Sequence, residues 1–153
     1  NPFKVLKNLN LSYFFMFFKK SDKRQKEEFF VKICSLLIHA AKIDENYTVN
    51  EENIITQTLI QLGLNKENIS ETINQAKLLE ENSNQILDFT KEVKNVSQKD
   101  KIKIIEALWS IIYSNKDADM YETNLMRRLA GLLYIDSKTM GDIKEKIKKN
   151  NLE

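Results

Sequence analysis

The stretch that decides the fold is "LLIHAAKIDENYTVNEENIITQTLIQLGLNKENI", residues 36–69. When the sequence is shifted by 71 positions, this stretch lies without a gap over "ALWSIIYSNKDADMYETNLMRRLAGLLYIDSKTM", residues 107–140. Few residues are identical, but apolar residues occupy matching positions at helical spacing and the two polar loops fall in register. The sequence therefore predicts two helix–loop–helix repeats offset by 71 residues, each of which needs the other to bury its apolar face.

The composition indicates an all-α protein. The 153 residues include only three glycines and one proline, so few of the residues that strands need for their turns are present. Helical periodicity covers nearly the whole chain and predicts a bundle of about seven to eight helices. The predicted helices lie at about residues 2–18, 21–43, 49–62, 66–81, 84–95, 98–114, 120–133 and 137–149. We divide the chain into an aromatic-rich N-terminal helix, residues 1–20, and a helical domain, residues 21–150.

The N-terminal segment contains "LSYFFMFFKK", residues 11–20. This apolar stretch is shorter than the roughly 20 residues that a membrane-spanning helix needs. The residues favour a helix whose aromatic side chains pack on the main bundle. The alternative is an amphipathic segment lying on a membrane or a partner, helped by the neighbouring Lys19, Lys20, Lys23 and Arg24. We expect a cytoplasmic protein, with the inner face of the membrane as the alternative location.

The net charge of +2 is unevenly distributed along the chain. Residues 1–30 hold seven Lys/Arg and three Asp/Glu, whereas residues 31–98 hold six and ten. The basic first part favours an anionic surface and the acidic middle favours cations. Neither charge excess is large enough to indicate nucleic acid, so we expect a protein partner instead.

The first repeat loop, "IDENYTVNEE" at residues 43–52, has oxygen-bearing side chains at every second position. An EF-hand calcium loop needs Gly at its sixth position and a bidentate carboxylate at its twelfth. Counted from Asp44, these positions hold Val49 and Ile55. The second loop fails in the same way, so the sequence excludes an EF-hand at both places.

Both loops instead have the spacing of a capping box, in which a capping residue is followed three positions later by Glu. These pairs are Thr48 with Glu51 and Asp119 with Glu122. Helix capping is therefore the favoured interpretation, and a weakly held divalent cation is the alternative. The candidate metal ligands are Asp44, Glu51, Asp117, Asp119 and Glu122. No other cofactor is expected.

The remaining reactive residues do not form a catalytic set. Cys34 lies on an apolar helix face, which predicts a buried and inert thiol. His39, the single histidine, follows five positions later and so points to a different side of the helix. We therefore expect no enzymatic activity. Arg127 and Arg128 are interpreted as covering a helix surface and pairing with nearby acids, with a phosphate or partner contact as the alternative.

The chain resembles the TerB-like family, named for tellurite resistance protein B, and most closely its stand-alone bacterial type. The resemblance covers about residues 31–142 and is most specific in "EALW" and "YETNLMRRLAGLL" in the second half. It implies an all-α bundle and a link to tellurite and metal stress, but no reaction. The loops depart from the family's Ala-Asp-Gly, having Ile-Asp-Glu at 43–45 and Ser-Asn-Lys at 114–116.

From the residues and the resemblance together, we expect a non-enzymatic interaction or stress-response module. The alternative is a weak divalent-cation-binding or cation-sensing domain that uses the two acidic repeat loops.

Overall fold

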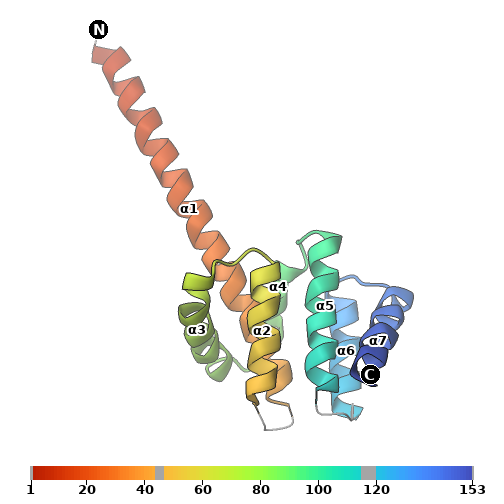
Figure 1. Ribbon diagram of the computed structural model, residues 1–153. Coiled ribbons are helices and arrows are strands. Elements are labelled where there is room, and N and C mark those ends of the chain that lie inside the picture. Colours follow the sequence, from red (N-terminus) through yellow and green to blue (C-terminus); the bar gives the residue numbers. More distant parts are fainter. Residues whose placement is uncertain (1, 44–46, 115–119, 153) are drawn as a thin grey trace.

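The computed structural model describes residues 2–43, 47–114 and 120–152, with side chains for residues 22–43, 47–91, 93–114 and 124–151. These residues form seven α-helices and one 3-10 turn, without a strand (Figure 1). The elements are α1 (Pro2–Ala41), α2 (Val49–Gln61), η1 (Lys66–Asn68), α3 (Ile69–Glu81), α4 (Leu87–Val93), α5 (Gln98–Tyr113), α6 (Met120–Leu132) and α7 (Ser137–Leu152). The predicted all-α bundle is confirmed.

The internal repeat is visible in the bounds of the helices. α2 and α6 begin and end 71 residues apart, and the segment 66–81 that forms η1 and α3 is offset by the same amount from α7. The packing also repeats, because α1 lies along α3 and α5 lies along α7. Each repeat therefore contains three helices, one more than the sequence predicts, and α4 alone links them.

The core lies between the two repeats, where α1 and α5 pack against each other and against α2. Equivalent positions of the repeats share the burial: Leu37 and Leu108 are both fully buried. The aromatic residues predicted as core are buried or partly buried. They are Phe29, Phe30, Phe89, Trp109 and Tyr113. Helix α4 adds Phe89 to this core by packing on α1.

Helix α1 differs from the prediction, because two predicted helices at 2–18 and 21–43 are one continuous helix. The connecting sequence "KKSDKRQKEE" (19–28) has no Gly or Pro and is rich in good helix formers, so nothing interrupts the backbone hydrogen bonds. The helix extends well beyond the bundle at its N-terminal end (Figure 1). The predicted packing of this segment on the bundle is therefore wrong.

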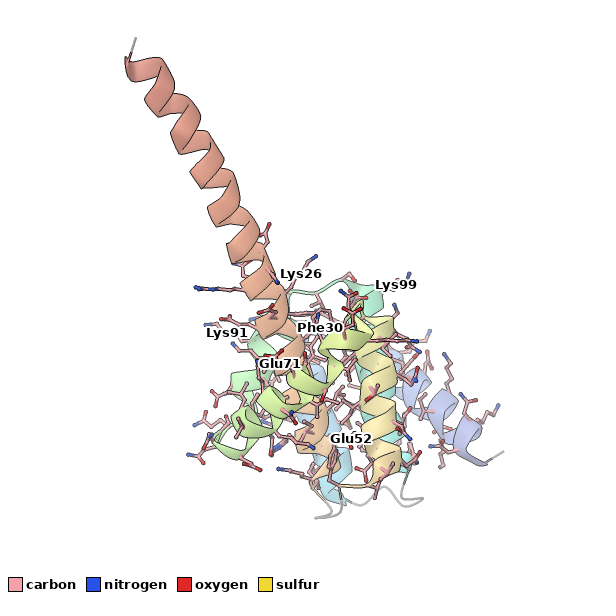
Figure 2. The ribbon with its side chains drawn as sticks, turned by 60° about the vertical axis from the view of Figure 1, so that its left-hand side comes forward. Lys26, Phe30, Glu52, Glu71, Lys91 and Lys99 are labelled. Atoms are coloured by element: carbon pink, nitrogen blue, oxygen red, sulfur yellow. The ribbon has the colours of Figure 1, made fainter. Side chains whose placement is uncertain are left out.

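The entry of α1 into the bundle is marked by a change in exposure. Side chains 22–28 are exposed, whereas Phe29 is half-buried and Phe30 is buried. Figure 2 shows Lys26 about one turn before Phe30, on the side of the projecting part. Among the described residues, no helix has the length and apolar character that crossing a membrane needs.

Candidate functional site

The first candidate site is the start of α2, which follows the first repeat loop. Thr48 is the N-cap residue, and its hydroxyl oxygen accepts a hydrogen bond from the backbone N–H of Glu51 at 3.2 Å. The Glu51 carboxylate reaches back and accepts from the backbone N–H of Thr48 at 3.4 Å and from its hydroxyl at 2.9 Å. The predicted capping box is confirmed at this loop.

A group of polar side chains lies around the start of α2. Glu51 is completely buried, which is unusual for a carboxylate. Next to the cap, the hydroxyl oxygen of Tyr47 is shielded from solvent. The ammonium of Lys77, on α3, lies 5.4 Å from the centre of the Tyr47 ring and 3.7 Å from a carboxylate oxygen of Glu52. The loop is thus joined to α3 through Tyr47 and Lys77.

Neither Tyr47 nor Cys34 ionises readily in this environment. Burial, followed by the negative charge of Glu52, raises the pKa of Tyr47 well above its ordinary value. Burial likewise raises the pKa of Cys34 to about 12, against a smaller opposing effect of Lys77. At neutral pH this holds the Cys34 thiol in its protonated form, in which a thiol is a weak nucleophile. The prediction that Cys34 is buried is confirmed.

The side chains of the other predicted metal ligands are not among those that the structure describes. Asp44, Asp117 and Asp119 lie outside the described residues, and of Glu122 only the helical backbone in α6 is described. Among the described side chains, no three acidic, histidine or cysteine residues come close enough to hold a metal ion. Cation binding by the loops stays a prediction.

A second polar contact, which sequence reasoning missed, joins α1 to α3. Glu80 accepts a hydrogen bond from Lys42 at 2.8 Å, and its other carboxylate oxygen lies 3.4 Å from Nδ1 of His39. His39 thus faces α3, while Cys34 lies in the core, as the helical spacing predicts. The contact could not be found from sequence because it joins positions about 40 residues apart that carry no shared motif.

The third region of interest is the turn that ends α6. The backbone N–H of Ile135 bonds the carbonyl of Ala130 at 2.9 Å, and Tyr134 adopts a left-handed φ of 55°. Buried Lys101 donates a hydrogen bond to the carbonyl of Leu133 at 2.9 Å. The ammonium of Lys94 lies 4.8 Å from the centre of the Tyr134 ring. This turn therefore combines backbone capping by one lysine with an aromatic contact to another.

The same turn ends α2 in the first repeat, but there it uses glycine. The N–H of Leu64 bonds the carbonyl of Leu59 at 2.9 Å, and Gly63 holds the positive φ, 108°. Gly63 and Tyr134 are equivalent under the 71-residue offset. The sequence contained this signal, since the shifted alignment places a tyrosine opposite a helix-terminating glycine.

The two arginines of α6 are exposed. Neither Arg127 nor Arg128 forms an ion pair with another described residue, so the predicted pairing with nearby acids is not seen in this part of the chain. Their positive charges face solvent on the same helix that ends at Tyr134.

Comparisons with known proteins agree with this architecture. The family model described as tellurite resistance protein TerB matches residues 30–145, from the point where α1 enters the bundle into α7. Comparison with the curated proteins gives no match, and comparison with the solved structures gives none either. The matched segment covers both repeats and most of the chain. The chain therefore belongs to the tellurite resistance protein TerB family.

Proposed function

We propose that this chain is a non-enzymatic interaction module of a stress response linked to tellurite or metal, acting at the inner face of the cytoplasmic membrane. The observation that carries the proposal is the projection of α1 beyond the bundle (Figure 1). A helix of 40 residues is about 60 Å long, and only its second part packs against the other helices. A long helix that leaves its own domain is suited to contacting another surface.

The sequence of the projecting part supports an anionic lipid surface. Five phenylalanines occur between residues 3 and 18, which is most of the eight in the whole chain. They are followed by Lys19, Lys20, Lys23, Arg24 and Lys26. Aromatic residues enter the boundary between headgroups and acyl chains, and nearby lysines and arginines are attracted to anionic lipids by about 1 kcal/mol each.

The absence of an enzymatic role in this proposal rests on two reactive groups, one on α1 and one just before α2. Cys34 is buried with a raised pKa, and the Tyr47 hydroxyl is likewise held protonated. A nucleophile or a general base must reach its reactive form near neutral pH and must meet its substrate. These two side chains meet neither condition.

Liposome flotation tests the membrane part of the proposal. The full chain is mixed with vesicles of phosphatidylglycerol and phosphatidylethanolamine, or with vesicles of phosphatidylcholine alone. We expect flotation with the anionic vesicles, and its loss in Phe17→Glu/Phe18→Glu and in Lys19→Gln/Lys20→Gln. The matched control is Lys148→Gln/Lys149→Gln, which removes two exposed charges from α7. Equal flotation of all variants, or none for the unaltered chain, would contradict the proposal.

The stress-response part is tested in the native host. We expect deletion of this chain to lower the potassium tellurite concentration at which growth stops, and restoration by the unaltered chain but not by Phe17→Glu/Phe18→Glu. Unchanged growth of the deletion strain across a tellurite series would contradict this part. The flotation result would still stand or fail by itself.

Weak binding of a divalent cation by the repeat loops is the second candidate function. The observation in its favour is the fully buried carboxylate of Glu51, which follows Asp44 by seven positions in the sequence. Calorimetry with Ca²⁺, Mg²⁺, Mn²⁺ and Zn²⁺ tests it, with Asp44→Ala/Asp117→Ala as the variant. The candidate predicts heat and a higher Tm that the variant loses. No heat and no shift of Tm at millimolar metal would end it.

A further inference from the structure

One face of α6 combines features that folding of the chain does not require. Gly131 lies four positions after Arg127 and three after Arg128, so it neighbours both arginines on the helix surface. All three are exposed, and Tyr134 follows three positions after Gly131 in the turn that ends the helix. We call these four residues the α6 face.

Tyr134 is an unfavourable choice for its position in the fold. A tyrosine in the left-handed region is strained by contacts between its Cβ and the backbone, whereas glycine avoids them. The first repeat makes the same turn with Gly63. The Tyr134 side chain is 69% exposed, so it recovers little of this cost through burial. Its contact with Lys94 is the one aromatic interaction recorded for it among the described residues.

Gly131 is a second position at which the residue present is less favourable for folding than another would be. It lies in the last part of α6, and a Cβ built on it would meet no atom within 4 Å. Alanine would therefore fit there and favour the helix. The consequence of glycine is a bare stretch of exposed backbone between the arginines and the tyrosine, over which another chain can pass closely.

The charged side chains of the α6 face, and the lysine that contacts it, are all positive. Arg127 and Arg128 have no ion-pair partner among the described residues, and Lys94 lies over the Tyr134 ring. Arginine and tyrosine are among the residue types that contribute most at protein–protein contacts, and an arginine fork binds a carboxylate with two parallel hydrogen bonds. An acidic protein segment is complementary to this arrangement.

We infer that the α6 face is a docking site for an acidic segment of a partner protein. Carboxylates of the segment bind Arg127 and Arg128, its backbone passes over Gly131, and an apolar or aromatic side chain packs on Tyr134. This inference rests on the proposed role as an interaction module and adds the surface and the chemistry of the partner. The α6 face lies in the second repeat, far along the sequence from the part of α1 that is proposed to contact the membrane.

Fluorescence anisotropy with the full chain and a short labelled oligoglutamate peptide tests the docking site. We expect Arg127→Glu/Arg128→Glu to weaken binding by about tenfold or more, because both carboxylate contacts become repulsive. The matched control is Lys148→Glu/Lys149→Glu, which changes the net charge equally on α7 and should alter the Kd by less than about twofold. An oligoglutamine peptide of the same length should bind to none of these proteins.

A second pair of variants separates binding from folding. Gly131→Ala should raise the Tm by about 2 °C and yet weaken oligoglutamate binding, since a methyl group blocks the approach to the backbone. Gly141→Ala is the control: it lies in α7, its Cβ would also meet no atom within 4 Å, and it should raise the Tm without changing binding. A role of Gly131 in folding alone would leave the Kd unchanged in both variants.

Three results would overturn the docking site. The first is no binding of oligoglutamate at millimolar concentration, and the second is equal weakening of its binding by the α6 and α7 charge variants. The third is that binding of inorganic phosphate or a single-stranded oligonucleotide depends on the α6 arginines while binding of oligoglutamate does not. If flotation succeeds while any of these occurs, the interaction module stands and the α6 face is not its protein-binding surface. If flotation fails while oligoglutamate binds as expected, the membrane proposal fails alone.

Discussion

The two repeats solve the same folding problem with different residues. In both, a long helix packs along the third helix of its repeat, and the middle helix ends in the same hydrogen-bonded turn. Where the first repeat ends α2 with Gly63, the second ends α6 with Tyr134. Where the first repeat has buried Phe30, the second has buried Lys101, whose ammonium caps the end of α6. Equivalent positions that agree between the repeats thus serve folding. Positions that differ indicate what else each repeat does.

Lys101 and Tyr134 differ in exposure, and their expected effects on stability differ accordingly. Lys101 replaces an apolar residue but is buried and hydrogen-bonded, so its effect is on stability. Tyr134 replaces a glycine but is exposed, so its effect on stability is unfavourable. Comparing equivalent residues in this way separates a substitution that the fold compensates from one that it does not.

The largest effect is expected where the repeats agree. Leu37→Ala and Leu108→Ala should each lower the free energy of unfolding by about 2–5 kcal/mol, because both side chains are completely buried and each change leaves a cavity. Urea unfolding measures both. A loss below about 1 kcal/mol in one repeat only would show that the core is not shared between them.

A smaller loss is expected for Lys101→Met, which keeps the apolar stem and removes the hydrogen bond to Leu133. The carbonyl loses a charged donor in a buried setting, which should lower the free energy of unfolding by about 1–3 kcal/mol. Lys103→Met is the comparison at the end of α2, because the Lys103 ammonium, also on α5, donates to the carbonyl of Gln61 at 3.3 Å from a more exposed site. We expect less than about 0.5 kcal/mol there. Equal losses would contradict the role given to burial.

Removal of the first capping box should lower the free energy of unfolding by about 1–2 kcal/mol. Thr48→Ala removes the hydroxyl that bonds both the N–H and the carboxylate of Glu51, whereas Thr48→Ser keeps it and should be close to neutral. Asp119→Ala tests whether the second loop uses the same cap. If Thr48→Ala is as stable as the unaltered chain in thermal unfolding, the capping account of this loop is wrong.

The cap of α7 should respond to pH. Hydrogen bonds from Thr139 to the Asp136 carboxylate lower the pKa of Asp136, and the backbone N–H contributes at 2.6 Å. Because the pKa is lower in the folded state, the stabilisation is present at neutral pH and is lost as the pH falls below about 4. We expect the Tm difference between the unaltered chain and Asp136→Ala to shrink in acid. A difference that stays constant down to pH 2 would contradict the charged cap.

Much of the fold could be predicted because the apolar positions that the two repeats share are the positions at which their helices pack. The 71-residue offset predicted the equal bounds of α2 and α6, and the Thr48–Glu51 spacing predicted the capping box. The third helix of each repeat was harder to match, since "KENISETINQAKLLEE" and "SKTMGDIKEKIKKNNL" share apolar spacing but almost no residues. Packing along α1 and along α5 reveals the equivalence that sequence identity does not.

The path of α1 and the candidate sites were less predictable for a different reason. The predicted break between residues 18 and 21 does not occur, because serine and charged residues only weakly disfavour a helix and no Gly or Pro stops it. The contacts of Glu80 with His39 and Lys42 join distant positions and leave no local pattern. The exposure of the α6 face depends on where α5 and α7 pack, which periodicity alone does not specify.

The central claim is that the repeats share one fold and that Tyr134 serves something other than folding. Reciprocal exchange at the two turns tests it most directly, with the free energy of unfolding measured for Gly63→Tyr and Tyr134→Gly. We predict that Gly63→Tyr loses about 1–2 kcal/mol and that Tyr134→Gly gains up to about 1 kcal/mol. A loss for Tyr134→Gly as large as that for Gly63→Tyr would show that Tyr134 is needed by the fold and would contradict the account.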